Sequence, residues 1–351
     1  MKLNYKKLKE FDNHKLVVSI KDKATGLKGF VAIHNSSLGI PAVGGTRMMP
    51  YHSEKEALVD VLKLSRAMTY KCAMASVPYG GGKAVIIGNP KKQKTKKLLT
   101  AYAQKINTLK GQFYTGEDMG ITQRNVIDML KTSKYFIGKP KYAGDPSPYA
   151  ALSVFYAMQG AVKYVQGKKS LEESKVAIRG VGKVGKALVK LLSRERANIF
   201  VSDTDPAALK FIKRKFPKVH VVSNRIIQTL PVDIYSPCAV GDEFSFKRSK
   251  GKIGAKIICG AANNQLADEK IGDWLFKNNI IYIPDYVANA GGLIDVVDEL
   301  GKDGYKKKRV LRKIKEIQET VQCILSLSSK AHLSPHRVAD QIAEQSFQKI
   351  K

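Results

Sequence analysis

At 351 residues, the chain exceeds the size at which single hydrophobic cores stop growing, so we expect two domains. It has no apolar run of roughly 18 residues, which argues against a membrane span. Its cysteines lack the paired spacing of a metal site. Because it also has no signal-peptide pattern, we expect the cytosol. Its formal net charge of +31 comes from dispersed lysines without a helix-turn-helix, zinc-finger or RNP-type pattern, so we expect anionic small molecules rather than specific nucleic acid.

The first half begins with a β-rich stretch over Gly26–Met48 that ends in a Pro- and Gly-rich turn. A helix is then predicted over Ser53–Ala75, because apolar residues recur there at helical spacing. Ser53 followed three residues later by Glu56 is the pattern of a capping box at its start. Another helix is predicted over Thr95–Leu109.

Between these helices, "VPYGGGKAVIIGNP" is interpreted as a glycine turn over Gly80–Gly82 followed by a strand. A phosphate-binding P-loop is the alternative, but it requires Ser or Thr where Ala84 stands. Lys83 is therefore expected to be an enclosed amine beside a second cation, Lys71, with a lowered pKa that lets it act as a base. Lys71 would stay protonated and attract a carboxylate, and Asp118 in "FYTGEDMG" could receive a proton or hold an ammonium group.

The Gly- and Pro-rich segment Gly138–Tyr149 is the predicted domain boundary. We expect an N-terminal α/β domain over residues 1–147 and a second domain over 148–324. The helical residues 325–351 could pack back on the first domain. A helix over Ala150–Val165 is followed by short apolar strands alternating with helices, which indicates a doubly wound parallel sheet. These strands are Val176–Ile178, Ile199–Ser202, Val219–Val222, Asp233–Tyr235, Ile257–Cys259 and Ile280–Ile283.

The stretch "KVAIRGVGKVGKALVKLL" places a G-x-G-x-x-G pattern between a predicted strand and a helix. Gly180 would make the tight turn, Gly182 would let the backbone approach a pyrophosphate, and Gly185 would allow close packing. Asp203, 18 residues after Gly185, can accept hydrogen bonds from a ribose and repel a 2′-phosphate, which favours NAD over NADP. A glycine turn without a ligand is the alternative.

Eight stretches together resemble the leucine/phenylalanine/valine dehydrogenase branch of the glutamate dehydrogenase superfamily, over nearly the whole chain. They are "DKATGLKGFVAIHNSSLGIPAVGGTRM", "MTYKCAMASVPYGGGKAVIIGNP", "GEDMG", "GDPSP", "GVGKVG", "YSPCAVG", "CGAANNQLAD" and "IPDYVANAGGLIDVVDEL". The resemblance implies reversible oxidative deamination of an L-amino acid with NAD, by a homo-oligomer. It also implies that residues 1–147 form the substrate-binding and oligomerisation domain and that residues 148–324 form an NAD-binding, Rossmann-type domain.

The resemblance also implies roles for individual residues. Lys83 would be the general base, Asp118 would assist at the amino group, and Lys71 would bind the substrate carboxylate. The other implied substrate-binding residues are Gly44, Met68, Gly116, Asn263, Leu293 and Val296. The implied cofactor-binding residues are Ser147, Gly180, Val181, Gly182, Lys183, Val184, Gly185, Asp203, Thr204, Ala239, Val240, Ala262, Asn263 and Asn289.

Gly116 and Leu293 resemble the residues of members that prefer aromatic substrates, so we expect phenylalanine or a large aliphatic amino acid. Ala150 and Asp295 depart from the residues that are usual at these positions in the family, which puts the shape of the pocket in doubt. A leucine- or valine-preferring dehydrogenase with the same chemistry is the alternative. A catalytically retired, basic binding protein is a further alternative, against which the lysine pair, Asp118 and the glycine pattern argue.

Overall fold

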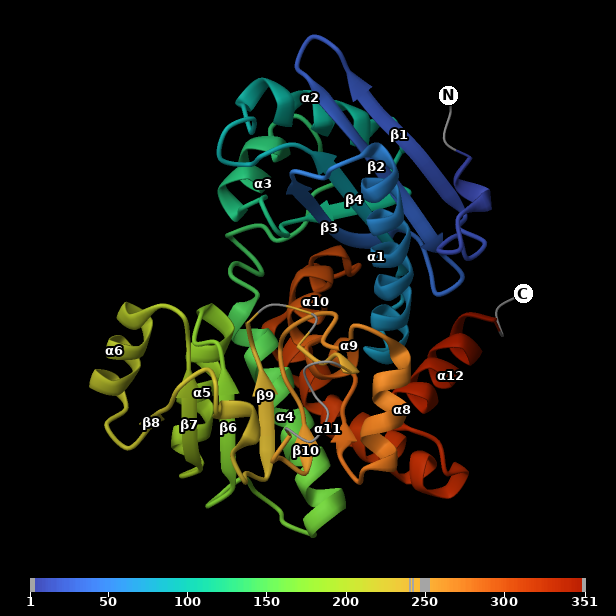
Figure 1. The fold of residues 1–351 in the computed structure, drawn as a ribbon. Helices are drawn as coiled ribbons and strands as arrows, with labels where there is room; N and C mark the ends of the chain where they lie inside the picture. The colour runs from blue at the N-terminus through green and yellow to red at the C-terminus, as the bar shows by residue number, and fades with distance from the viewer. Residues whose placement is uncertain (1–3, 240, 242, 247–252, 349–351) are drawn as a thin grey trace. The chain divides into compact units, whose positions relative to one another are not determined.

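The computed structural model describes residues 4–239, 241, 243–246 and 253–348, and it contains two compact units (Figure 1). The first unit comprises the residues up to Asp145, Val296–Lys306 and the residues from Ala343. The second unit comprises Pro146–Asp295 and Lys307–Ile342. The division between Asp145 and Pro146 thus lies inside the predicted boundary segment. In the C-terminal helical region, only the residues from Ala343 group with the first unit.

The first unit contains a five-stranded mixed sheet with the strand order β1-β2-β4-β3-β5. Strand β2 runs antiparallel to its neighbours β1 and β4, whereas β3 runs parallel to both β4 and β5. The elements are the 3-10 helix η1 (Tyr5–Lys7), β1 (Leu16–Asp22), β2 (Leu27–Asn35), β3 (Ala42–Met49), α1 (Glu54–Met74), β4 (Gly80–Ile87), α2 (Lys96–Asn107), β5 (Phe113–Gly116), α3 (Gln123–Leu130) and the 3-10 helix η3 (Asp298–Leu300).

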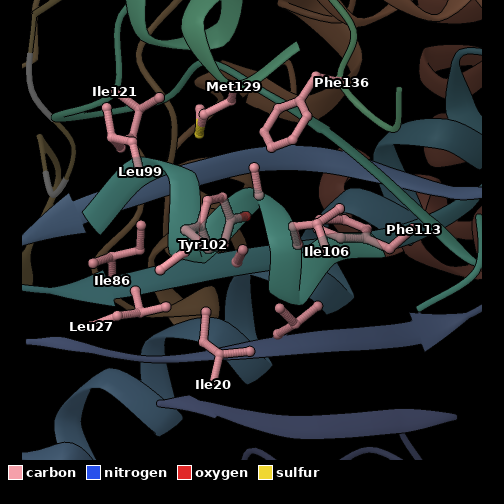
Figure 2. Close-up of a cluster of buried hydrophobic side chains, with 14 of the residues drawn as sticks. Ile20, Leu27, Ile86, Leu99, Tyr102, Ile106, Phe113, Ile121, Met129 and Phe136 are labelled. Atoms are coloured by element: carbon pink, nitrogen blue, oxygen red, sulfur yellow. The ribbon is translucent and has the colours of Figure 1, made fainter. Parts of the chain in front are cut away.

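Helices cover both faces of this sheet, and the alternation of side chains along each strand decides which core they enter. Ala84 and Ile86 of β4 belong to the core beneath α2 and α3, where Tyr102 and Phe113 are fully buried (Figure 2). Val85 belongs to the opposite core, beneath α1. Odd-numbered residues of β4 therefore face α1, which places the Lys83 side chain on that side of the sheet.

The start of α1 forms much as the sequence predicts. The Ser53 hydroxyl accepts a hydrogen bond from the Glu56 backbone N–H at 3.1 Å. The Glu56 carboxylate, however, accepts from the N–H of His52 at 2.7 Å, one residue before the position that a capping box uses. Both interactions satisfy backbone donors that the first helical turn leaves without partners.

The prediction that Gly80–Gly82 form a turn is wrong, because these residues begin strand β4 and are buried. Gly80 and Gly81 pair with Ala42 and Val43 of β3, and Gly82 pairs with Ile33 of β2. Pairing on both sides supplies the backbone hydrogen bonds that a turn would otherwise satisfy locally. Tertiary pairing has thus overridden the local preference of glycine.

The second unit contains a six-stranded parallel sheet with the order β11-β10-β9-β6-β7-β8. This order reverses direction between β6 and β9, as in dinucleotide-binding folds, and it confirms the predicted doubly wound architecture. The elements are α4 (Ser147–Gln166), β6 (Lys175–Arg179), α5 (Lys183–Arg194), β7 (Asn198–Ser202), α6 (Pro206–Lys215), β8 (His220–Val221), η2 (Ile227–Thr229), β9 (Ile234–Pro237), β10 (Ile257–Ile258), α8 (Glu269–Lys277), β11 (Ile281–Tyr282), α9 (Asp285–Ala288), α10 (Gly291–Val297), α11 (Lys307–Ala331) and α12 (Pro335–Gln348).

The long helix α11 packs against α4 through an apolar stripe that is buried along its length. A Cβ atom at Gly160 of α4 would lie 2.5 Å from the Gln318 carbonyl oxygen of α11, so the two helix backbones approach closely at this glycine. The stripe consists of Val310, Ile314, Ile317, Val321 and Ile324.

No helix within the described residues is both long and apolar enough to cross a membrane.

Candidate active site

Two of the predicted catalytic residues meet in the first unit. Lys83 lies in β4, and Asp118 lies in the loop that follows β5. The Lys83 Nζ donates a hydrogen bond to Asp118 Oδ2, and the two side chains are only 8% and 19% exposed. The sequence analysis expected Lys83 to lie beside a second cation, whereas the contact in the structure is a carboxylate.

The Asp118 carboxylate is ionised in this environment. Burial alone would raise its pKa, but the charges of Lys83 and Arg47 and the backbone N–H of Met119 outweigh burial and lower the pKa to about 2. The Met119 N–H donates to Oδ1 at 2.5 Å, so each carboxylate oxygen has a donor. The pair is therefore an oriented anion in contact with an amine, a suitable arrangement for moving protons at a substrate nitrogen.

An arginine that the sequence analysis missed completes this cluster. Arg47 Nε of β3 lies 3.7 Å from Asp118 Oδ1, and its Nη1 donates to Asp60 of α1 at 3.2 Å. The Tyr51 hydroxyl donates to the same Asp60 oxygen at 2.6 Å. Arg47 stands in the quoted stretch "GGTRM", so its motif was visible, but nothing in the local sequence indicates its two distant carboxylate partners.

The absence of side chains at Gly81 and Gly82 lets helix α1 and the ring of Phe113 pack directly against strand β4, so no open space remains beside these glycines. A Cβ atom at Gly81 would lie 2.0 Å from the backbone nitrogen of Thr69 in α1. A Cβ atom at Gly82 would lie 2.8 Å from the ring of Phe113. The glycines therefore let α1 pack directly on β4 near Lys83, which encloses the lysine by a different route from the expected turn.

Close packing also gathers several of the residues predicted to bind substrate. Met68 and Lys71 lie three residues apart in the last turns of α1, on neighbouring positions of the helix surface. A Cβ atom at Gly44 would lie 1.9 Å from the Gly82 carbonyl oxygen and 3.3 Å from Met68 Cγ. Gly44 is therefore fixed by contact with the backbone of β4, and Met68 lies directly over it.

The residues predicted to select the substrate are distributed over both units. Gly116 ends β5, and a Cβ atom there would lie 3.0 Å from the Ile137 carbonyl oxygen. Val296 groups with the first unit and lies near Gly138, whereas Leu293 is a buried residue of the second unit. A methyl group at position 116 would thus press on the Ile137 backbone.

The glycines predicted to bind a dinucleotide lie at the carboxyl end of β6 in the second unit. Gly180 follows β6 with φ +99°, and a Cβ atom there would lie 2.8 Å from the Ala239 nitrogen. A Cβ atom at Gly185 would lie 2.1 Å from the Gly180 carbonyl oxygen, so α5 starts in contact with the turn. By contrast, no atom lies within 4 Å of a Cβ atom at Gly182, the N-cap of α5. Space for a ligand therefore remains at Gly182 alone among these three.

Asp203 follows β7 and is already engaged with the glycine turn. Its carboxylate accepts hydrogen bonds from the backbone N–H groups of Val181 at 2.6 Å and Asp205 at 2.9 Å. Burial would raise its pKa, but these bonds, with smaller contributions from the Thr204 N–H and the Lys186 charge, lower the pKa. An ionised Asp203 beside the turn fits a ribose hydroxyl and opposes a phosphate.

Further predicted cofactor residues lie beyond the ends of β9, β10 and β11. Asn289 donates from its side-chain amide to Asn263 Oδ1 at 2.7 Å and to the Ala261 carbonyl oxygen at 3.0 Å. Ala262 is buried and Ala239 is exposed, whereas Val240 lies outside the described residues.

Glycines after Asn289 pack α10 against the first turns of α4. A Cβ atom at Gly291 would lie 2.0 Å from the Tyr149 carbonyl oxygen, and one at Gly292 would lie 3.7 Å from the Ala150 methyl group. Ser147, another predicted cofactor residue, is the first residue of α4. The remaining predicted residues, Lys183, Val184 and Thr204, are exposed or half-buried around the α5 N-terminus and the end of β7.

This geometry fits a dinucleotide. The open position at Gly182 admits a pyrophosphate to the backbone, and the N-terminus of α5 stabilises negative charge there. Among the described residues, no group of three or more His, Cys, Asp or Glu side chains lies together in a way that could hold a metal ion.

Models of known protein families match segments of both units. A family model described as Glu/Leu/Phe/Val dehydrogenase, dimerisation domain, matches residues 13–135, and one described as Glutamate/Leucine/Phenylalanine/Valine dehydrogenase matches residues 207–350. The chain is 41% identical over 347 residues to the phenylalanine dehydrogenase of Caldalkalibacillus thermarum (strain TA2.A1), covering 97% of this chain and 93% of that protein.

A second relative is named for a different aromatic substrate. The L-tryptophan dehydrogenase of Nostoc punctiforme (strain ATCC 29133 / PCC 73102) is 41% identical over 332 residues, covering 94% of this chain and 92% of that protein. The crystal structure of L-tryptophan dehydrogenase from Nostoc punctiforme superposes with a TM-score of 0.83 at 38% identity and covers 96% of both chains.

Proposed function

Because this chain belongs to the Glu/Leu/Phe/Val dehydrogenase family, we propose that it converts a large L-amino acid, NAD and water into the 2-oxo acid, ammonium, NADH and a proton, reversibly. The observation that carries this proposal is the enclosed contact between Lys83 and the ionised Asp118. A buried amine held by a carboxylate is the pair of groups that deprotonating an ammonium and activating water require.

The side chains of the first unit do the proton chemistry. Lys71 binds the substrate carboxylate and thereby holds the amino group in reach of the catalytic pair. Asp118 stays ionised and stabilises the positive charge that the substrate nitrogen carries as ammonium and then as iminium. Lys83, as the neutral amine, first takes the proton of the substrate ammonium and releases it to solvent, which leaves the amine from which the hydride departs. Lys83 then accepts the proton of the water that adds to the iminium carbon and returns it to the nitrogen, which leaves as ammonia.

The second unit would hold the cofactor. The turn from Gly180 to Gly185 would bind the pyrophosphate, and Asp203 would accept a hydrogen bond from the adenosine ribose. The amide pair Asn263 and Asn289 would orient the nicotinamide end and the substrate. When bound, NAD supplies the acceptor for the hydride that leaves the substrate Cα. We propose NAD and not NADP because Asp203 is ionised.

The proposed substrates are phenylalanine and large aliphatic amino acids. Gly116 and Leu293 favour the aromatic class, and the names of the two relatives above support it. Leucine or valine preference with the same mechanism is the second candidate, because a methylene group changes discrimination by only about 1–3 kcal/mol.

The proposal is tested by following NADH formation at alkaline pH with phenylalanine, tryptophan, leucine, valine and glutamate as separate substrates. We expect turnover of the hydrophobic substrates and none of glutamate. The absence of turnover with every amino acid would refute the proposed activity. A leucine rate far above the phenylalanine rate would refute only the preference.

We also propose a cytosolic homo-oligomer. All four cysteines are free thiols, which suits a reducing compartment. The model that matches residues 13–135 is described as a dimerisation domain, and this supports association through the first unit.

A further inference from the structure

We infer that Arg47 is a positioning residue for Asp118, holding the carboxylate at the oxygen that Lys83 does not contact so that its oxygens face the reacting groups. This inference rests on the proposed function, which makes Asp118 a catalytic residue. It assigns a specific task to an arginine that neither the sequence patterns nor the family comparison singled out.

The two cations approach different oxygens of the carboxylate. Lys83 Nζ donates to Oδ2, whereas Arg47 Nε lies 3.7 Å from Oδ1, which also accepts from the Met119 N–H. Contacts on both oxygens oppose rotation of the carboxylate, and at Oδ1 the Arg47 side chain adds to the hydrogen bond from the Met119 N–H. The Asp118 carboxylate is therefore oriented by three donors or cations from β3, β4 and its own loop.

Arg47 is itself rigidly held. Its side chain is 14% exposed, and it lies on the α1 side of the sheet, where Asp60 accepts from its Nη1 at 3.2 Å. Tyr51 donates to the same Asp60 oxygen at 2.6 Å and so fixes that carboxylate in turn. Burial opposes the charge of Arg47, but Asp118 and Asp60 outweigh burial and raise its pKa.

The buried Arg47 Nε has no hydrogen-bond partner within the described residues. A buried N–H group without a partner is costly, and Asp118 Oδ1 lies 3.7 Å from this nitrogen. Catalytic hydrogen bonds that are long in a free enzyme often shorten when substrate binds. The geometry thus gives Arg47 an unused donor 3.7 Å from the catalytic carboxylate.

The test uses the full-length protein and compares Arg47→Gln, Arg47→Lys, Asp118→Asn and the double variant Arg47→Gln/Asp118→Asn. Arg66→Gln is the matched control, because Arg66 also pairs with carboxylates in the first unit, at Asp12 and Glu344. For each variant, kcat and KM for phenylalanine, their pH profiles and the thermal midpoint are measured.

If Arg47 orients Asp118, Arg47→Gln lowers kcat about 100-fold, as expected when a catalytic group moves by about 1 Å. Arg47→Lys recovers part of that loss, and Arg47→Gln adds almost nothing in the Asp118→Asn background. Arg66→Gln lowers the thermal midpoint without changing the pH profile. Losses that multiply in the double variant, or a kcat of Arg47→Gln equal to that of Arg66→Gln, would overturn the inference.

A crystal structure of Arg47→Gln separates this inference from the proposed function. The inference predicts that the Asp118 carboxylate rotates away from its contact with either Lys83 or the Met119 N–H. An Asp118 carboxylate in an unchanged position would overturn the inference even if the wild-type enzyme is active. Wild-type protein without turnover would refute the proposed function, and the carboxylate position would still decide whether Arg47 holds it.

Discussion

Lys83 and Asp118, which are 35 residues apart in the chain, are joined by a hydrogen bond from the lysine amine to the carboxylate. The contact forms because β4 and β5 both pair with β3, and because Gly45 of β3 lets the loop after β5 approach: a Cβ atom at Gly45 would lie 2.9 Å from Asp118 Cβ. The proposed catalytic pair thus depends on the order of the strands and on a glycine that tolerates close approach.

Adding a methyl group at Gly182 should weaken cofactor binding, whereas adding one at Gly185 should destabilise the fold. Gly182→Ala adds a methyl group in open space, so the free energy of unfolding should change by less than about 0.5 kcal/mol. The KM for NAD should rise about tenfold, because the methyl group enters the ligand space. Gly185→Ala, the matched variant, places its methyl group 2.1 Å from the Gly180 carbonyl oxygen and should lower the thermal midpoint. Equal losses of stability in the two variants would contradict this division.

Cofactor choice should depend on the charge of Asp203. Replacing it in Asp203→Ser removes an ionised carboxylate beside the ribose position, so kcat/KM with NADP should rise relative to NAD by about tenfold or more. Initial rates with both cofactors at saturating phenylalanine give this ratio. A wild-type enzyme that prefers NADP would show that Asp203 does not set the choice.

Substrate preference should respond to Gly116. The methyl group of Gly116→Ala would lie 3.0 Å from the Ile137 carbonyl oxygen, so residue 137 must move by a few tenths of an ångström. We expect the ratio of kcat/KM for phenylalanine to that for leucine to fall about tenfold, within the range available to one methylene group. An unchanged ratio, with both rates lowered together, would mean that position 116 affects only stability.

Acid should destabilise the first unit through buried histidines. Burial, the nearby His14 ring and the Arg66 charge outweigh Asp12 and lower the pKa of His34 from 6.5 to about 4. The unfolded chain therefore takes up this proton first, and stability that is complete above pH 6.5 is lost as the pH falls toward 4, by at most about 3 kcal/mol. Burial also lowers the pKa of His14, which adds to the loss in the same direction.

Urea unfolding at a series of pH values between 7 and 4 measures this dependence. His34→Gln should be less stable than wild type at pH 7, because it disturbs the contacts of His34 with Thr69 and Asp12, but its stability should fall less steeply with acid. His52→Gln, a change at an exposed position, should retain the wild-type slope. Identical slopes in wild type and His34→Gln would contradict the assignment.

The second unit could be predicted from sequence because its signals are local. The apolar run predicted as Val176–Ile178 became β6, Lys175–Arg179, and the glycine pattern after it identified the turn and the start of α5. Parallel strands buried on both faces appear in the sequence as short continuous apolar runs separated by helices. Each strand can therefore be predicted without knowledge of the strands with which it pairs.

The first unit was harder to predict because its site depends on contacts between distant residues. Gly80–Gly82 favour a turn by themselves, and only pairing with β2 and β3 makes them a strand. Arg47 meets Asp60 because β3 and α1 pack together, and Asp118 joins them through a loop that follows another strand. No spacing rule along one segment reports such a cluster, although it contains the groups that complete the catalytic pair.

The most direct test of the central claim is the turnover of phenylalanine with NAD by the wild type and by Lys83→Met, which retains an unbranched side chain at this buried position but has no amine. Lys97→Ala, a change of an exposed lysine in α2, is the control. We predict that Lys83→Met lowers kcat about 10³-fold, within the range expected for the loss of a general base, while circular dichroism shows an intact fold. Lys97→Ala should keep the wild-type rate. A folded Lys83→Met protein with a kcat close to that of wild type would contradict the assignment of Lys83 as the base.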